Sequence, residues 1–361
     1  MADDAQDPNR IVTVLLPEDE YTHTPDKAEN YNESMYLNAF DLGLQAGGWF
    51  RLGNRVNEGY AEMSICIYLP DGSVGFMFDR PKIETNDGMS AGGLTIEVVA
   101  PFEHLRVTYD GRVCLLADPS QMAEPRTAFR ENPIVDCTVE LDYRGVSPMY
   151  GGKPQYADGR EIDVEPGTSF AKAHYEQHCA VTGTITVADP DGGAGTVLDI
   201  DGLGLRDKSW GPRYWQALTW YRWLPMVFSD DFAMMISVID RGAGAVGDGD
   251  GAPRQSGMVL VGDEYHKIRE CTVDAEWNDR GEQTTMRCWV RTDEQEYEVT
   301  GEVLSMIPLR NRRTTPDGEQ LHTRITEAMT RFECDGQVGI GMSEFLDQVI
   351  DGWPIGVPER A

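Results

Sequence analysis

The chain has 361 residues, with 31 Lys and Arg against 61 Asp and Glu, a formal net charge of −30 at pH 7. This acidity argues against binding to nucleic acid or to an anionic membrane, since both need clustered basic side chains. The length predicts about two domains with a sizeable core.

The N-terminus and the cysteines indicate a reduced compartment. Residues 1–7 are acidic and lack the apolar core of a signal peptide, and no stretch approaches the ~18 apolar residues of a membrane span. The 7 cysteines are scattered without a Cys-x-x-Cys pair, which predicts free thiols, no zinc site and no disulfide framework. We therefore expect a cytoplasmic protein.

Short runs of alternating apolar and polar residues fill the first half of the chain. The clearest run carries Met63, Ile65, Ile67 and Leu69, and Asp-Gly pairs at 71–72, 87–88 and 110–111 are strong hairpin signals. The predicted strands span 11–16, 30–41, 48–54, 58–69, 73–79, 94–99, 104–109, 113–118 and 134–143. Such closely spaced strands predict an antiparallel sandwich or barrel.

The second half repeats this pattern after an irregular stretch at 144–172, which puts a domain boundary near residue 170. Its predicted strands span 180–187, 196–202, 232–240, 258–261, 271–277, 284–291, 297–307, 323–334 and 338–345. Helical periodicity is weak, and 174–178 and 344–350 are the best candidates for short helices. We therefore predict a mostly β protein with an N-terminal extension (1–29), two β-domains (30–170 and 171–352) and a tail (353–361).

Aromatic residues gather between residues 199 and 223, among glycines and charged side chains. The aromatic and charged members are Trp210, Trp215, Trp220, Trp223, Tyr214, Tyr221, Arg206, Asp207, Lys208, Arg213 and Arg222. Large aromatic area beside a few polar groups is typical of a small-molecule pocket. The alternative is a packed corner between sheets with a buried Asp–Arg pair, since aromatic clusters are first of all core material.

Asp207 is the first candidate for a catalytic acid. A carboxyl group kept protonated by apolar surroundings can deliver a proton to carbon, and aromatic faces can stabilise the cation that forms. Arg213 would orient Asp207 or a substrate oxygen. Alternatively, Asp207 forms an ion pair that fixes a turn, which would lower its pKa and make it unfit as an acid. The candidate partners for that ion pair are Arg206, Lys208 and Arg213.

Glu176 and Glu33 are the alternative acids. Glu176 lies between His174 and His178, and histidines four residues apart on a helix could share a metal ion. In an extended strand the two imidazoles would be about 13 Å apart. Because the segment leads directly into a predicted strand, we predict no metal and expect His174 to be a polar site residue at the junction of the domains.

Nucleotide-binding signatures are missing from the aromatic stretch and its surroundings. Gly202 and Gly204 lack a third glycine that opens a helix, as a dinucleotide-binding loop requires, and no Walker motif is present. We therefore expect a protein that works without a cofactor.

Several short motifs resemble a known family. They are Asn32-Glu33-Ser34, Pro70-Asp71-Gly72, Tyr109-Asp110-Gly111, His174-Tyr175-Glu176-Gln177, Gly339-Ile340-Gly341-Met342-Ser343-Glu344 and the stretch from Asp201 to Arg213. Together they resemble bacterial proteins related to hydroxyneurosporene synthase (carotenoid 1,2-hydratase) and the AttH-like proteins, from about residue 30 to about residue 350. The most specific piece is Gly204–Arg213.

This resemblance implies two lipocalin-like (calycin-type) antiparallel β-barrel or sandwich domains, packed side by side, with an apolar pocket. The better-known members of the group add water to an alkene or close a ring, without metal or nucleotide. A shared fold does not by itself fix the reaction.

We therefore predict a cofactor-independent lyase or isomerase that acts on an apolar terpenoid, steroid or similar molecule by proton transfer at carbon. Asp207 or Glu176 would be the acid/base group, assisted by Arg213. The predicted substrate-binding residues are Trp210, Trp215, Trp220 and Tyr221, joined by Tyr36, Glu33 and His174 if the site lies between the domains.

Two alternatives stay open. A carrier would bind the apolar ligand and release it unchanged. A cyclase would only hold a reactive conformer, which needs shape rather than an acid. In all three cases the expected partner is an apolar small molecule, and a homodimer is an open alternative to a monomer.

Overall fold

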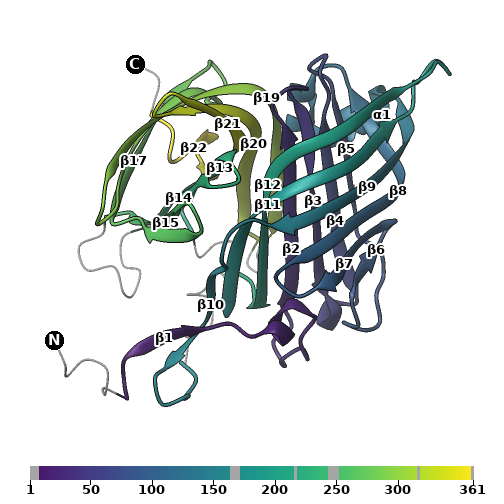
Figure 1. The fold of residues 1–361 in the computed structure, drawn as a ribbon. Coiled ribbons are helices and arrows are strands. Elements are labelled where there is room, and N and C mark those ends of the chain that lie inside the picture. Colours follow the sequence, from purple (N-terminus) through teal and green to yellow (C-terminus); the bar gives the residue numbers. More distant parts are fainter. Residues whose placement is uncertain (1–7, 163–170, 215–217, 243–251, 315–317, 359–361) are drawn as a thin grey trace.

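The computed structural model describes residues 8–162, 171–214, 218–242, 252–314 and 318–358. In these residues the chain is mostly β, as predicted, and forms two large antiparallel sheets that stand side by side (Figure 1). The predicted substrate-binding residue Trp215 lies outside the described residues. No helix in the described ranges is long and apolar enough to cross a membrane.

The first sheet has 12 strands in the described residues. They are β1 (Ile11–Val14), β2 (Tyr31–Asp41), β3 (Ala46–Arg55), β4 (Tyr60–Tyr68), β5 (Val74–Asp79), β6 (Met89–Ala91), β7 (Leu94–Ala100), β8 (His104–Leu116), β9 (Ile134–Gly145), β10 (Tyr150–Tyr156), β11 (Ala173–Val187) and β12 (Thr196–Pro212). Their order is β1-β10-β11-β12-β2-β3-β4-β5-β8-β7-β6. Because β9 pairs with both β11 and β8, the run from β11 to β8 closes into a lipocalin-like barrel.

The barrel interior is lined by alternate residues of its strands. In β9, Val135, Cys137, Val139 and Leu141 are buried, while the residues between them are exposed. This is the period-two pattern of a strand with one face toward a core. The buried side chains pack with apolar residues of the other barrel strands into one cluster.

The second sheet has 10 strands in the described part of the chain. They are β13 (Trp220–Ser229), β14 (Phe232–Asp240), β15 (Arg254–Val261), β16 (Glu264–Lys267), β17 (Glu270–Trp277), β18 (Gln283–Arg291), β19 (Glu296–Thr314), β20 (Gln320–Cys334), β21 (Gln337–Ile350) and β22 (Trp353–Pro354). Their order is β16-β15-β14-β13-β21-β20-β19-β18-β17, and β22 pairs with β21. This sheet encloses a core of its own.

A third apolar cluster joins the two sheets. Tyr36, Phe40 and Trp49 of the first sheet pack in it with Met329 and Met342 of the second. The second sheet therefore covers the outer face of the barrel at β2 and β3. This contact explains why β2 is buried on both faces rather than at alternate positions.

Helical structure in the described residues is limited to α1 (Pro125–Glu131) and the 3-10 turns η2 (Pro17–Glu20), η3 (Val56–Glu58) and η4 (Pro119–Ala123). The two predicted short helices, 174–178 and 344–350, are wrong, since these residues lie in β11 and β21. In each case pairing with strands on both sides holds the segment extended.

The passage from one sheet to the other does not coincide with the expected boundary near residue 170. Strands β11 and β12 follow that point and pair within the first sheet, where they help to close the barrel. The chain crosses to the second sheet between Pro212 and Trp220.

Candidate active site between the two sheets

One row of side chains crosses six strands of the first sheet, on the face turned toward the second sheet. Pairing in register joins, in this order, Tyr150, Glu176, Asp207, Tyr36, Arg51 and Ser64. Residues directly opposite one another on neighbouring strands lie on the same side of a sheet, with Cβ atoms about 5 Å apart. The register therefore gathers polar side chains from distant segments into one line.

Glu176 is the fully buried carboxyl group of this row. Its Oε1 accepts a hydrogen bond of 2.8 Å from Nε1 of Trp223 in β13, and its Oε2 has no hydrogen-bond partner among the described residues. Burial raises the pKa of Glu176 to about 7, against a lowering effect of His174 and with a further raising effect of Asp207. A large fraction of Glu176 is thus protonated at neutral pH.

His174 and Asp207 form an ion pair beside Glu176. Nε2 of His174 contacts Oδ2 of Asp207 and lies 3.9 Å from Oε1 of Glu176. Desolvation lowers the pKa of His174, but the charge and hydrogen bond of Asp207 outweigh it and raise the pKa to about 9. His174 therefore carries a proton at neutral pH. Because its side chain is 48% exposed, solvent reaches the row at this point.

Two of the bases expected near Asp207 lie elsewhere. Arg206 and Lys208 point to the opposite face of β12, where they form ion pairs with Glu20 and Glu33. The side chains of consecutive residues in a strand point to opposite faces, so this separation follows from the extended backbone. The predicted ion pair of Asp207 exists, but its partner is a histidine of the neighbouring strand.

Arg213 is the predicted base that stays close to Asp207. Its Nη2 donates a hydrogen bond of 2.6 Å to Oγ of Ser209. Burial and the charge of Arg51 lower the pKa of Arg213 to about 10, while the charge of Asp207 acts in the opposite direction. Arg213 thus remains charged at neutral pH and lies at the same end of the row as Arg51.

His174, Glu176 and Asp207 have the spacing of a metal site. Within the described ranges their ligand atoms all lie within 4.8 Å of one another. A metal ion would have to displace the protons that His174 and Glu176 hold at neutral pH. We therefore interpret the three groups as a proton-transfer cluster. His178, the other histidine of this segment, is not part of the cluster, since its Nδ1 lies 3.0 Å from the hydroxyl of Tyr265.

The second sheet contributes a pair of carboxyl groups next to Trp223. Glu344 of β21 pairs in register with Trp223 on one side and with Glu327 of β20 on the other. The two carboxyl groups are hydrogen-bonded to each other, and Tyr221 donates its hydroxyl to Glu344. Burial raises the pKa of Glu344 to about 7, and burial together with Glu344 raises that of Glu327 well above its ordinary value. The pair therefore retains a shared proton at neutral pH.

Aromatic rings border the row on both sheets. Tyr36 packs edge-on against Trp223 with ring centroids 5.5 Å apart, and it stacks with Trp49 at 5.9 Å. Tyr150 packs edge-on against Tyr265 of β16 at 6.0 Å. The buried carboxyl group thus lies among electron-rich rings, which can stabilise a developing cation.

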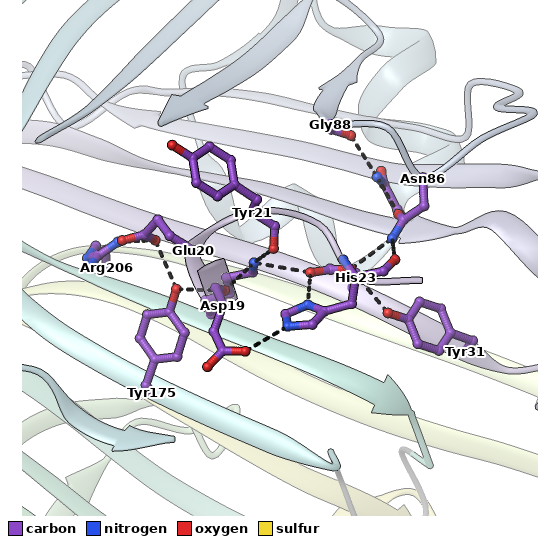
Figure 2. Close-up of polar contacts among 12 residues, drawn as sticks. Asp19, Glu20, Tyr21, His23, Tyr31, Asn86, Gly88, Tyr175 and Arg206 are labelled. Atoms are coloured by element: carbon purple, nitrogen blue, oxygen red, sulfur yellow. Dashed lines mark hydrogen bonds and ion pairs between the residues drawn. The ribbon is translucent and has the colours of Figure 1, made fainter. Parts of the chain in front are cut away.

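Glu33 and Trp210, two predicted site residues, lie on the opposite face of the first sheet. The N-terminal segment packs against this face, where Figure 2 shows its residues Asp19, Glu20 and His23. Nδ1 of His23 lies 2.8 Å from Oε1 of Glu33, and the ring of His23 stacks on Trp210 at 4.0 Å. Burial raises the pKa of Glu33, but His23 and Lys208 outweigh it and hold the pKa below its usual range. Glu33 is therefore ionised and unfit as an acid.

Only part of the aromatic stretch reaches the row. Trp220 packs against the interior of the second sheet, with the guanidinium of Arg222 5.0 Å from its ring centre. Tyr221 and Trp223 point the other way and contact Glu344 and Glu176. Side chains alternate between the two faces of a strand, and this alternation in the sequence could have shown that Trp220 points away from Tyr221 and Trp223. The sequence-based prediction omitted Trp223 and Glu344, and also Tyr150 and Arg51, from the site.

A hollow of about 570 Å³ lies away from this row, over β17, β18, β19 and β20. Its lining includes Asp274, Arg287, Glu302 and Arg331. Small-molecule pockets are mostly apolar with a few convergent polar groups, and this charged outer surface does not fit that description. The row between the sheets is distinguished instead by its buried titratable groups.

The closed barrel and the second sheet beside it define a double lipocalin-like β protein. The chain belongs to the family of the domain of unknown function DUF7064, which matches residues 16–349. No curated protein matches the sequence at a significant level.

Three solved structures share the fold along nearly the whole chain. CghA, determined with Sch210972, is 12% identical with a TM-score of 0.53 and covers 93% of this chain and 98% of its own. An AttH protein (NE1406) of Nitrosomonas europaea is 13% identical with a TM-score of 0.52, covering 95% and 98%. Kievitone hydratase from Nectria haematococca is 10% identical with a TM-score of 0.51, covering 94% of each chain. The AttH-like part of the expected resemblance is confirmed at the level of fold, and none of the three is a hydroxyneurosporene synthase.

Proposed function

We propose that the protein is a cofactor-independent lyase or isomerase that moves a proton to or from carbon in an apolar small molecule, a terpenoid, a steroid or a similar ring compound. The observation that carries the proposal is Glu176. It is a fully buried carboxyl group whose Oε2 lacks a hydrogen-bond partner in the described part of the chain. Its pKa of about 7 keeps a proton available at neutral pH.

Glu176 is the proton donor in this mechanism, in preference to Asp207. The proton of Glu176 adds to an alkene or ring carbon, and the faces of Trp223 and Tyr36 stabilise the cation. In a hydration, water then supplies hydroxide to the cation and its proton returns to a carboxylate. In an isomerisation a carboxylate instead removes a proton from the carbon next to the cation, and the double bond forms there.

Asp207 and Glu176 are adjacent carboxyl groups in different environments. Asp207 forms an ion pair with His174, whereas burial favours the protonated form of Glu176. Neighbouring carboxyl groups in different environments are an arrangement that acid/base enzymes use to divide the two roles. We assign Asp207 as the base and Arg213 as the group that orients it.

The fold neighbours support this choice of reaction class. Kievitone hydratase is named for a hydration, and CghA was determined with a small molecule, Sch210972. The double lipocalin-like fold is thus compatible with hydratase chemistry, while the residues that would perform it here are argued from Glu176 and its surroundings.

Native mass spectrometry with a panel of terpenoids and steroids, followed by analysis of the released compounds, tests the proposal. The wild-type protein should release a product that differs by one water or is an isomer of the ligand. Glu176→Gln should retain the ligand and release it unchanged. Full turnover by Glu176→Gln would overturn the assignment of the acid, and unchanged release by the wild type would establish the carrier alternative.

A further inference from the structure

Arginines concentrate at one end of the row, in a chain whose net charge is −30. Glu62 of β4 lies 3.4 Å from Nη1 of Arg51 and 3.5 Å from Nη2 of Arg80. Burial raises the pKa of Glu62, but Arg51, Arg55, Arg80 and Arg213 together lower it below its usual value. Glu62 is therefore the ion-pair partner of both Arg51 and Arg80.

Small residues form a notch between two of these arginines. Ser209, Ser34 and Gly53 pair in register across β12, β2 and β3, two residues along each strand from the row of Glu176 and on the same face. A Cβ atom at Gly53 would stand 2.8 Å from Nη2 of Arg51 and 2.9 Å from Oδ1 of Asn32. The notch at Gly53 is thus filled by the guanidinium of Arg51 and the amide of Asn32, whose polar atoms meet there.

The polar atoms at this notch are incompletely paired. Nη2 of Arg51 is buried without a hydrogen-bond partner among the described residues, and so are Nδ2 and Oδ1 of Asn32. Asn32 is only 1% exposed. Buried donors without partners cost free energy, which a bound acceptor would recover.

We propose that Arg51, Arg213, Asn32 and Ser34 form a subsite for a carboxylate group of the substrate. A guanidinium presents paired N–H donors that match the two oxygens of a carboxylate. The amide of Asn32 and the hydroxyl of Ser34 would donate further hydrogen bonds to the same carboxylate. The inference rests on the proposed function in that the anion is part of the molecule that reacts at Glu176.

The distance between the two sites limits the substrate. Ser34 on β2 lies two strands away from Glu176 on β11, which corresponds to ~10 Å across the sheet. A carboxylate held at the notch would therefore present a carbon several bonds away to the proton of Glu176. The substrate class is an apolar acid with its alkene or ring remote from the carboxylate.

Isothermal titration of two acid–alcohol pairs, 5-phenylpentanoate with 5-phenylpentanol and farnesoate with farnesol, tests the subsite. The wild-type protein should bind each acid at least about tenfold more tightly than its alcohol. Arg51→Gln should abolish this preference and leave the affinity for the alcohols unchanged. Arg80→Gln is the matched control, since Arg80 shares Glu62 but has a side chain that is 53% exposed, and it should keep the preference.

A wild-type protein that binds neither acid better than its alcohol would overturn the subsite. So would a preference that survives in Arg51→Gln or is lost equally in Arg80→Gln. Glu176→Gln separates this inference from the proposed function, because it should lose turnover while it retains the preference for acids. If the preference for acids depends on Arg51 but Glu176→Gln keeps full turnover, the subsite is supported and the assignment of Glu176 as the catalytic acid is overturned.

Discussion

Nε1 of Trp223 donates a hydrogen bond of 2.8 Å to Oε1 of Glu176, and this bond links the second sheet to the first at the candidate site. The same tryptophan pairs in register with Glu344 and packs its ring against Tyr36. The side chain of Trp223 thus contacts the proposed acid Glu176 and the ring of Tyr36, and its strand is paired with the strand that carries Glu344. The site therefore depends on how the two sheets are docked.

Trp223→Phe should raise the pKa of Glu176 further. The indole N–H stabilises the ionised carboxylate, so its removal favours the protonated form by about one pH unit. Infrared difference titration of the protonated carboxyl band, with Glu176→Gln to assign the band, measures the change. Trp220→Phe is the control, because Trp220 faces the interior of the second sheet, and an equal change in that variant would contradict the prediction.

Asp207→Asn should lower the pKa of His174 from about 9 toward that of an ordinary histidine. The carboxylate of Asp207 is the main group that raises this pKa against desolvation. Proton NMR of the histidine ring as a function of pH gives the value directly, with His174→Gln to assign the resonance. A pKa that stays near 9 in Asp207→Asn would show that Asp207 is not the partner of His174.

Zinc should bind weakly at neutral pH despite the spacing of His174, Glu176 and Asp207. Two of these groups must release protons before they can ligate a cation, so affinity should rise as the pH is raised. Thermal unfolding with and without zinc chloride checks this, with His174→Gln as the variant that removes a ligand. Stoichiometric metal in the protein as purified, lost in His174→Gln, would instead identify a metal centre.

Glu176→Gln should stabilise the protein at alkaline pH. The folded-state pKa of about 7 lies above the ordinary value of 4.5, so the contribution of Glu176 to stability is full at acid pH and is lost as the pH rises through 7. The variant lacks this dependence, and its advantage should approach roughly 3 kcal/mol above neutral pH. Urea unfolding at several pH values measures it. Glu140→Gln, at an exposed position of β9, should show no such trend.

Much of the fold could be predicted from alternation and turns, because a strand with one face in a core has a simple pattern. β9 is an example. The alternating segment 58–69 also forms a strand, although both faces of β4 are buried. β12 shows the limit, since its strand was predicted only to residue 202 and in fact runs to Pro212. Both faces of its second half carry charged side chains that pair with other segments, so the alternation of apolar residues disappears.

The candidate site could be predicted only in part for a related reason. Glu176, Asp207, His174 and Tyr36 could be selected as candidate site residues from the chemistry of their side chains. That these four lie together depends on the register between strands far apart in sequence, which no local pattern specifies. The same applies to Glu33, whose carboxylate is paired by the N-terminal segment on the other face.

Glu20→Ala should destabilise the protein strongly, because it leaves Arg206 buried with an uncompensated charge. Glu20 is 1% exposed, forms an ion pair with Arg206 and accepts a hydrogen bond from the hydroxyl of Tyr175 (Figure 2). It also accepts a hydrogen bond from the backbone N–H of Phe102. Removing one partner of a buried ion pair costs about 3 kcal/mol or more.

Urea unfolding at neutral pH gives the cost of Glu20→Ala, and Glu18→Ala is the matched control. Glu18 lies in the same 3-10 turn and is exposed, so its removal should change the free energy of unfolding by less than about 0.5 kcal/mol. If the two variants lose equal stability, the N-terminal segment does not hold Arg206 in solution. If Glu20→Ala alone is destabilised, the segment is an integral part of the barrel, and truncation before residue 30 should likewise weaken the fold.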